Sequence, residues 1–287
     1  MAKVAAAAGE RNFAKSVGYG LLFGVAFLAS ILWHKELFLV LMAVSASAGS
    51  WELSTALRQA GWYVPRVPVA VGSLLIMPAT FYGGAKWQWA VTAAMIIALT
   101  IWRGVHLLWE RRESVTQSFR KSLRDFSAAA FVVIYVPLMC SFAILLLRRE
   151  PDGAAWVIQF VVPTAMIDTF GYLVGRKLGK HKIAPGVSPK KTLEGLMASI
   201  IAGVASSVIL MVLVVHQAWW WGVVTAACVI VTAVFGDLAE SLIKRDLGVK
   251  DMSSWLPGHG GVMDRLDSML PSALVVYIIA TIFFATA

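Results

Sequence analysis

Two apolar stretches flank one densely charged segment near the end of this 287-residue chain. The sequence reads WWWGVVTAACVIVTAVFGDLAE over 219–240, SLIKRDLGVKDMSSWLPGHGGVMDRLD over 241–267 and MLPSALVVYIIATIFFAT over 269–286. Each apolar stretch can cross a bilayer as a helix, which needs roughly 17–25 residues. The segment between them carries four aspartates, four lysines or arginines and a GHGG run. This pattern predicts two membrane helices joined by a loop that performs chemistry.

The composition places the whole chain in the same class. It is 59% hydrophobic and only 14% charged, whereas soluble domains have roughly 25% charged residues. We therefore predict an all-α, polytopic integral membrane protein. Apolar windows indicate about nine transmembrane helices, at 17–33, 37–57, 67–85, 87–102, 126–147, 155–175, 196–215, 219–240 and 269–286.

The basic residues predict the orientation. With nine spans, most lysines and arginines fall on the same side as the N-terminus, and only Lys35, Lys86, Arg148 and Arg149 fall on the other side. By the positive-inside rule, the N-terminus is cytoplasmic and the C-terminus is outside. The net charge of +9 reflects this bias and favours contact with anionic membrane lipids. No basic run alternates with stacking aromatic residues, so we expect no nucleic-acid partner.

The motifs and charges divide the chain into two regions. Residues 1–160 read as N-terminal transmembrane helices without a distinctive motif. Residues 161–287 read as a C-terminal catalytic region with cytoplasmic loops at 176–195 and 244–268.

Acidic residues within or beside the predicted spans mark candidate functional positions. Asp168, Asp237 and Glu240 lie there, and a carboxyl group in a membrane is costly unless it is paired, protonated or bound to a cation. Taken alone, Asp168 also fits a hydrogen bond between packed helices. Asp237, Glu240, Ser241 and Lys244 are spaced so that a helix presents them on one face.

Two further acids follow the GHGG run. Asp264 and Asp267 are three residues apart, which suits the start of a helix and its dipole. Alternatively, they converge with Asp237 on one divalent cation. Magnesium fits this donor set best, because Mg²⁺ takes few carboxylates and completes its shell with water and phosphate oxygens. A zinc site at His259 is disfavoured, since no second histidine or cysteine lies near it in sequence.

The loop at 176–195 contains Ser188-Pro-Lys190-Lys191-Thr192. Its prolines and glycines favour a defined turn, which can present backbone N–H groups and lysines to phosphates. The alternative is a basic loop that only sets the topology. The chain contains no Walker, GxSxG, HExxH or Rossmann motif, so covalent serine or cysteine catalysis has no support.

These segments resemble the signature of one family, the phosphatidate cytidylyltransferases, also called CDP-diacylglycerol synthases. The C-terminal part of the likeness consists of Ser241-Leu-Ile-Lys-Arg245, Lys250-Asp251 and Pro257-Gly-His-Gly-Gly-Val-Met-Asp-Arg-Leu-Asp267. The upstream part consists of Asp168, Gly175-Arg176, Gly179-Lys180, Ser188-Pro-Lys-Lys-Thr192, Glu194-Gly195 and Gly236-Asp237. The resemblance is specific over roughly 165–270.

The resemblance implies a reaction and its cofactor. This family condenses CTP with phosphatidic acid to give CDP-diacylglycerol and pyrophosphate, with Mg²⁺ and room for a second, monovalent cation. The lipid phosphate attacks the α-phosphorus of CTP, so no protein nucleophile is needed and catalysis consists of positioning and charge neutralisation. We expect the site at the cytoplasmic edge of the sixth and eighth spans, in a bacterial plasma membrane.

The resemblance also assigns expected roles. The expected metal ligands are Asp237, Asp264 and Asp267, with Asp168 as a fourth acid that holds a lysine or the second cation. Groups expected at the phosphates of CTP or at pyrophosphate are Lys244, Arg245 and Arg265. Groups expected at CTP or the lipid phosphate are Ser188, Lys190 and Lys191. The nucleotide bend is expected at His259, Gly260 and Gly261, and Glu240 and Asp251 are supporting members.

Three other interpretations stay open at this point. A CTP-dependent polyprenol or phytol kinase would share the membrane acids but transfer the γ-phosphoryl group. A cation-coupled transporter would use intramembrane acids, although the chain shows no internal repeat. A homodimer is also possible, because small residues such as those at 202–205 can pair helices or subunits.

Overall fold

Helices account for most of the molecule, which confirms the all-α class. The computed structural model describes residues 24, 27, 29–31, 33–109, 115–184, 188–249, 251–253, 255 and 260–284, with the backbone alone at 107–109, 115–119, 184 and 188–190. The helices are α2 (Lys35–Gln59), α3 (Arg66–Trp109), α4 (Val115–Val133), the π-helical turn η1 (Ile134–Leu138), α5 (Met139–Arg148), α6 (Gly153–Leu178), α7 (Leu193–Leu213), α8 (Trp219–Asp246), α9 (Met263–Leu266) and α10 (Met269–Phe283).

Seven helical stretches within these described residues are long and apolar enough to cross a membrane. The stretch Arg120–Arg148 joins α4, η1 and α5 into one of them. Large apolar side chains point outward from the helices, as Ile201 and Phe235 do with about two thirds of their surface exposed. Such faces suit a lipid environment, so the chain is an integral membrane protein. The count of nine spans and the orientation of the ends stay predictions, because most of the predicted first span lies outside the described residues.

The helix α3 contains two of the predicted spans. Gly84, at the expected boundary, has φ 69° and ψ −160°, a conformation that no residue in a regular helix adopts. A Cβ placed on Gly72 would lie 2.4 Å from the Met95 side chain, although a straight helix would separate these residues by roughly 34 Å. The chain therefore folds back on itself at Gly84, and the predicted boundary is confirmed.

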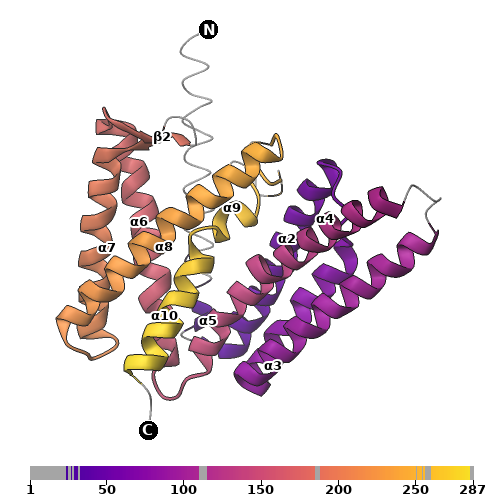
Figure 1. Ribbon diagram of the computed structural model, residues 1–287. Helices are drawn as coiled ribbons and strands as arrows, with labels where there is room; N and C mark the ends of the chain where they lie inside the picture. Colours follow the sequence, from indigo (N-terminus) through magenta and orange to yellow (C-terminus); the bar gives the residue numbers. More distant parts are fainter. Residues whose placement is uncertain are drawn as a thin grey trace.

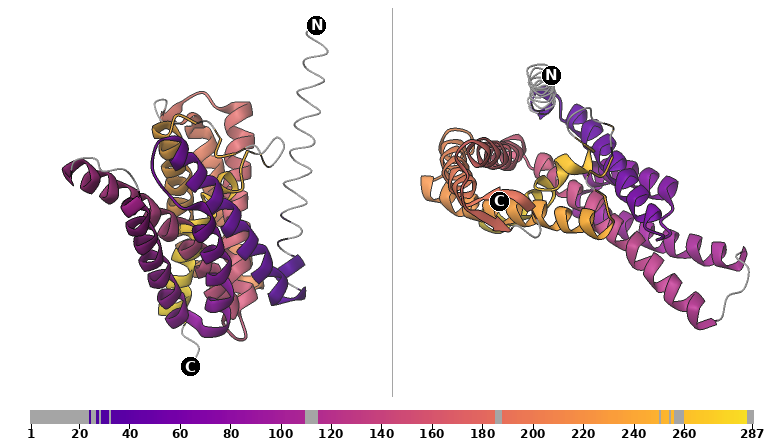
Figure 2. Two further views of the ribbon diagram at one scale, coloured as in Figure 1. Left: turned by 90° about the vertical axis from the view of Figure 1, so that its right-hand side faces the viewer. Right: turned by 90° about the horizontal axis from the view of Figure 1, so that it is seen from above.

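The helices form two groups with a seam between them (Figures 1 and 2). The indigo and magenta helices α2, α3 and α4 lie together, and α6, α7 and α8 form the second group. The helices α5 and α10 lie in the seam, where α10 contacts α5, α6 and α8. Large side chains such as Trp156, Leu146 and Leu270 are fully buried in the core that results.

A short antiparallel hairpin interrupts the helical architecture. Strands β1 (Lys182–Ala184) and β2 (Ser188–Thr192) pair so that Lys182 lies opposite Thr192. The sequence predicted a defined turn in this loop; the structure shows two paired strands there, and the residues between them, 185–187, lie outside the described residues. The hydroxyl of Thr192 accepts a hydrogen bond from the N–H of Gly195, which caps α7 directly after β2. The hairpin is thereby fixed between the end of α6 and the start of α7.

Candidate active site

Polar side chains gather where the C-terminal end of α8, the short helix α9 and the β-hairpin meet. Figure 1 shows these three elements near the same end of the molecule. Of these three elements, α8 is a long helix packed against α7 and α10, so the side chains near its C-terminal end have a rigid support.

The polar face predicted on α8 is confirmed. Ser241 donates a long hydrogen bond of 3.4 Å from its hydroxyl to the Asp237 carboxylate, one turn earlier. Lys244 Nζ lies 3.2 Å from Glu240 Oε2, also one turn apart. The four residues therefore form a continuous stripe that runs from the middle of the α8 C-terminal half to its last turn.

The hairpin reaches this stripe through one lysine. Lys191, on β2, forms an ion pair of 2.8 Å between its Nζ and Asp237 Oδ2. Glu194 holds the other side of the hairpin, since its carboxylate accepts hydrogen bonds from the backbone N–H groups of Lys180 and His181. The predicted phosphate-binding lysine thus lies at the acid stripe. The side chains of Ser188 and Lys190 lie outside the described residues.

Asp264 connects α8 to the turn that precedes α9. Its Oδ1 lies 2.7 Å from Lys244 Nζ. Its Oδ2 accepts backbone hydrogen bonds from Gly261, at 2.6 Å, and from Met252, at 3.1 Å. Gly260 in this turn has φ 80°, which favours glycine. The carboxylate therefore shapes the glycine turn as well as binding a lysine, a double role that the sequence did not predict.

Asp267 and Asp168 meet at the start of α10. Asp267 Oδ1 accepts a hydrogen bond of 2.7 Å from the N–H of Ser268, and the hydroxyl of Ser268 donates to Asp168 Oδ2, also at 2.7 Å. Lys191 lies near enough to Asp168 to act on it electrostatically. Asp168 thus lies beside the Asp267–Ser268 corner, and its hydrogen-bond partner is a serine.

A glycine brings α8 close to this junction. A Cβ on Gly236 would lie only 2.3 Å from the backbone oxygen of Asp267 and 3.0 Å from Pro271. Because Gly236 directly precedes Asp237, the absence of a side chain here lets Asp237 and Asp267 approach each other.

Two buried polar atoms at this site have no hydrogen-bond partner among the described residues. They are Oε1 of Glu240, whose residue is fully buried, and the hydroxyl of Tyr135. Glu240, Asp267 and Asp237 lie near enough to this hydroxyl to act on it electrostatically. Tyr135 belongs to η1, where Pro137 lies inside a π-helical turn, and such turns often occur at functional sites. Tyr135 could not be predicted from the sequence, because nothing in its local pattern distinguishes it from other aromatic residues of a span.

A second missed residue lies on α2. The carboxylate of Glu52, which is buried, accepts backbone hydrogen bonds from Val262 and Met263 at the start of α9. A signal was present in the sequence, since Glu52 is an acid inside a predicted span. The contacts show that the N-terminal helices reach the site.

Two of the three predicted magnesium ligands pair with lysines, whereas Asp267 accepts a hydrogen bond from the N–H of Ser268. Within the described residues, no three His, Cys, Asp or Glu side chains are grouped as a ready metal cage. Asp237 and Asp264 pair with Lys191 and Lys244 instead. The donor set still fits a magnesium ion, because Mg²⁺ needs only one or two carboxylates and the carboxyl groups of Glu240 and Asp267 lie against each other at this site.

The remaining predicted residues are placed as follows. Arg245 lies in the last turn of α8, and Arg265 lies within α9 beside Asp264. Gly260 and Gly261 form the turn that Asp264 holds. His259 lies outside the described residues.

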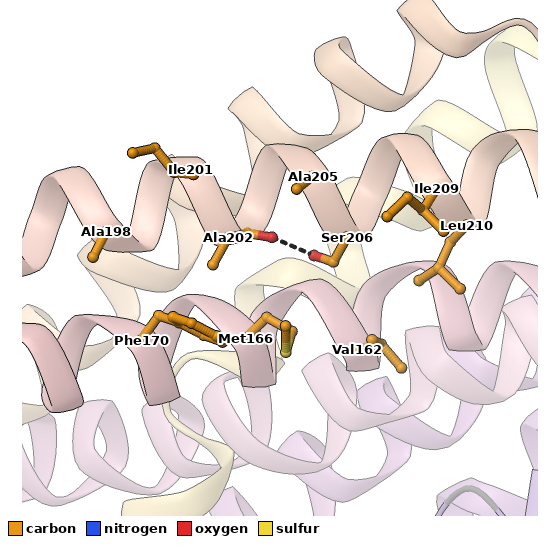
Figure 3. Close-up of a pocket in the computed structure, with 10 residues that line it drawn as sticks. All are labelled: Val162, Met166, Phe170, Ala198, Ile201, Ala202, Ala205, Ser206, Ile209 and Leu210. Carbon is orange, nitrogen blue, oxygen red and sulfur yellow. Dashed lines mark hydrogen bonds between the residues drawn. The ribbon is translucent and has the colours of Figure 1, made fainter.

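An apolar pocket of about 530 Å³ lies between α6 and α7 (Figure 3). Its α6 wall includes Met166 and Phe170, which are two residues either side of Asp168 and therefore on the opposite face of that helix. Ser206 contributes the only hydroxyl to the lining, and it is bonded to the backbone oxygen of Ala202. The pocket is therefore separate from the polar site.

Comparisons with known proteins identify the family of this chain. A model of the cytidylyltransferase family matches residues 15–283. A phosphatidate cytidylyltransferase of Mycobacterium bovis is 34% identical over 279 residues, which cover 95% of this chain and 89% of that protein. The Mycobacterium leprae phosphatidate cytidylyltransferase is 34% identical over 277 residues, covering 95% and 88% of the two chains. One from Thermotoga maritima is 37% identical over 162 residues, covering 54% and 59%. The match confirms the resemblance, and the chain belongs to the cytidylyltransferase family.

Proposed function

We propose that this protein transfers the cytidylyl group of CTP to phosphatidic acid, giving CDP-diacylglycerol and pyrophosphate, at the cytoplasmic face of a bacterial plasma membrane. The single observation that carries the proposal is the polar junction of α8, α9 and the hairpin. There, Lys191 and Lys244 are paired with Asp237 and Asp264 in a family whose named relatives perform this reaction.

The reaction must bring two anions together. A lipid phosphate and a nucleoside triphosphate repel each other strongly, so a catalyst has to supply positive charge where they meet. Lys191 approaches the site from the hairpin and Lys244 approaches it from α8. Two cations on different rigid elements can hold two phosphate groups at a fixed separation, which favours a reaction between them.

The bond changes are those of an in-line displacement. An oxygen of the phosphatidic acid phosphate forms a bond to the α-phosphorus of CTP, and the bond from that phosphorus to the bridging oxygen of the β-phosphate breaks. Pyrophosphate leaves with the electron pair of the broken bond. No protein atom is covalently modified, in agreement with the absence of a serine or cysteine catalytic motif in the sequence.

A magnesium ion is part of the proposal. Asp237, Asp264 and Asp267 would hold it, with the buried Glu240 beside them. When bound, Mg²⁺ would supply positive charge to phosphate oxygens. The two lysines would then exchange their carboxylate partners for phosphate oxygens of the substrates, while the Ser268 hydroxyl keeps Asp168 and the start of α10 in place.

The test uses the purified protein in detergent with phosphatidic acid, Mg²⁺ and CTP labelled at either the α- or the γ-phosphorus. We expect the α-label in a CMP-bearing lipid and the release of one pyrophosphate for each lipid formed. In a parallel reaction with a polyprenol in place of phosphatidic acid, transfer of the γ-label to the alcohol oxygen, with release of CDP, would instead establish a kinase. If neither label enters lipid and vesicles containing the protein take up a solute, the protein is a transporter and the proposal is wrong.

A further inference from the structure

One acid in the N-terminal half makes direct contact with the turn that carries the catalytic aspartates. Glu52, near the C-terminal part of α2, is 1% exposed. Its Oε1 accepts hydrogen bonds from the hydroxyl of Ser253 and, at 3.0 Å, from the N–H of Val262. Its Oε2 accepts from the N–H of Met263 at 2.8 Å. These donors lie more than 200 residues away in sequence.

Gly261 leaves space for the Glu52 carboxylate because it has no side chain. A Cβ on Gly261 would lie 2.4 Å from Glu52 Oε2, so any larger residue at 261 would collide with it. Placing a carboxylate in a protein interior is unfavourable unless hydrogen bonds compensate for the lost water. Three donors compensate here, and hydrogen bonds to a charged acceptor are stronger than those between neutral groups. The three hydrogen bonds therefore fix the position of the Glu52 carboxylate, and the carboxylate fixes the positions of Ser253, Val262 and Met263.

The position of these donors connects Glu52 to the site. Val262 and Met263 directly precede Asp264, whose own carboxylate accepts from the N–H of Gly261. Two acids thus hold consecutive N–H groups of a single turn: Asp264 holds the first, and Glu52 holds the next two. Asp264 in turn binds Lys244 on α8. A shift of Glu52 would move Asp264 relative to that lysine.

We infer that Glu52 is a positioning residue of the active site, which fixes the turn before α9 so that Asp264 and Lys244 meet in the geometry needed for nucleotide binding. The inference rests on the proposed function and goes beyond it, because it assigns a role in the site to the N-terminal half of the chain. Glu52 acts through the turn and touches neither the substrate nor the reacting atoms.

The experiment compares Glu52→Gln and Glu52→Asp with the control Asp125→Asn in the full-length protein. Asp125 is also 1% exposed and accepts from the backbone N–H of Tyr63 at 3.0 Å, but it bonds to Arg103, away from the turn. Three quantities are measured for each variant: the dissociation constant of CTP by calorimetry, kcat, and the thermal unfolding temperature in the same detergent.

We expect Glu52→Gln to weaken CTP binding and lower kcat by about tenfold or more, because its amide nitrogen cannot accept from one of the N–H groups and displaces the turn. Glu52→Asp keeps the charge and should recover part of both quantities. Asp125→Asn should lower the unfolding temperature and leave CTP binding as in the wild type. Wild-type CTP binding and kcat in Glu52→Gln would overturn the inference, as would an equal loss in Asp125→Asn.

The outcomes also separate this inference from the proposed function. CTP binding can be measured even if the wild-type protein forms no CDP-lipid, so a failed activity assay would count against the proposed function alone. A wild-type protein that forms the lipid together with an unimpaired Glu52→Gln variant would count against the role of Glu52 alone.

Discussion

Replacing Gly236 by alanine should increase the distance between Asp237 and Asp267 without removing any charged group. The new Cβ would lie 2.3 Å from the backbone oxygen of Asp267, whereas ordinary contacts begin at 3.4 Å. The backbones of α8 and of the α9–α10 junction must therefore move apart by about 1 Å. Asp237, the next residue on α8, moves with its helix, so its separation from Asp267 increases.

This displacement has two costs of different kinds. Overpacking of a well-packed interface typically costs about 1–3 kcal/mol of folding stability. A misplacement of about 1 Å at a catalytic site can lower the rate by about 100-fold. We therefore expect Gly236→Ala to fold with reduced stability and to lose about 100-fold in kcat.

A second glycine on the same helix supplies the control. A Cβ on Gly222, near the start of α8, would lie 2.6 Å from Val208 Cα and 3.0 Å from the backbone oxygen of Ser207. Gly222→Ala thus forces a similar separation between helices, at a place remote from the acids. Initial rates of CDP-lipid formation and thermal unfolding temperatures are measured for both variants in one detergent. We expect both variants to lose similar amounts of stability, and we expect kcat to fall only in Gly236→Ala. Equal effects of the two variants on kcat, or a normal kcat in Gly236→Ala, would refute the reasoning.

Three further substitutions test individual side chains. Asp237→Asn removes the partner of Lys191 and a proposed magnesium ligand, and it should abolish labelled-lipid formation at every Mg²⁺ concentration; activity at saturating Mg²⁺ would contradict that ligand role. Lys191→Ala should lower kcat/KM by about 10- to 100-fold, the equivalent of one charge-assisted hydrogen bond, whereas Lys35→Ala, which breaks an ion pair with Glu150 outside the site, should have wild-type kinetics. Tyr135→Phe removes a hydroxyl that is buried without a partner in the described residues, so the unfolding temperature should stay level or rise. We expect kcat to fall about tenfold, because a substrate oxygen would lose a hydrogen bond from this hydroxyl. An unchanged kcat would show that the hydroxyl takes no part in turnover.

Local periodicity was enough to predict the stripe on α8. Asp237, Glu240, Ser241 and Lys244 share one face of any helix, whatever surrounds it, and the hydrogen bonds from Ser241 to Asp237 and from Lys244 to Glu240 confirm that arrangement. Apolar length likewise predicted the membrane class, and the break at Gly84 coincides with the Gly-Gly boundary in the sequence. In each case the information lies within about one turn or one span of the chain.

The partners of these acids could not be predicted in the same way. Which lysine meets Asp237 depends on the packing of the hairpin, and the meeting of Glu52 with Val262 depends on how α2 packs against α9. Both contacts join segments that are far apart in sequence, and local patterns do not show which distant segments pack together. The assignment of residues 1–160 to a region without site residues therefore left out Glu52 and Tyr135, although each lies against the catalytic region.

The alternation of acids and lysines at the site has a physical rationale. Several carboxylates close together in a membrane protein repel one another and are costly to bury. Lys191 and Lys244 each pair with an acid on a different element, which offsets this repulsion and ties the hairpin to α8 and α8 to α9. The same lysines are the groups that an incoming phosphate would attract. When a phosphate draws a lysine away, the released carboxylate becomes available to a divalent cation, so binding of the anion and of the cation should favour each other. On this reasoning, the affinity for CTP should increase with Mg²⁺ concentration, and Lys244→Met should weaken that dependence even where CTP still binds.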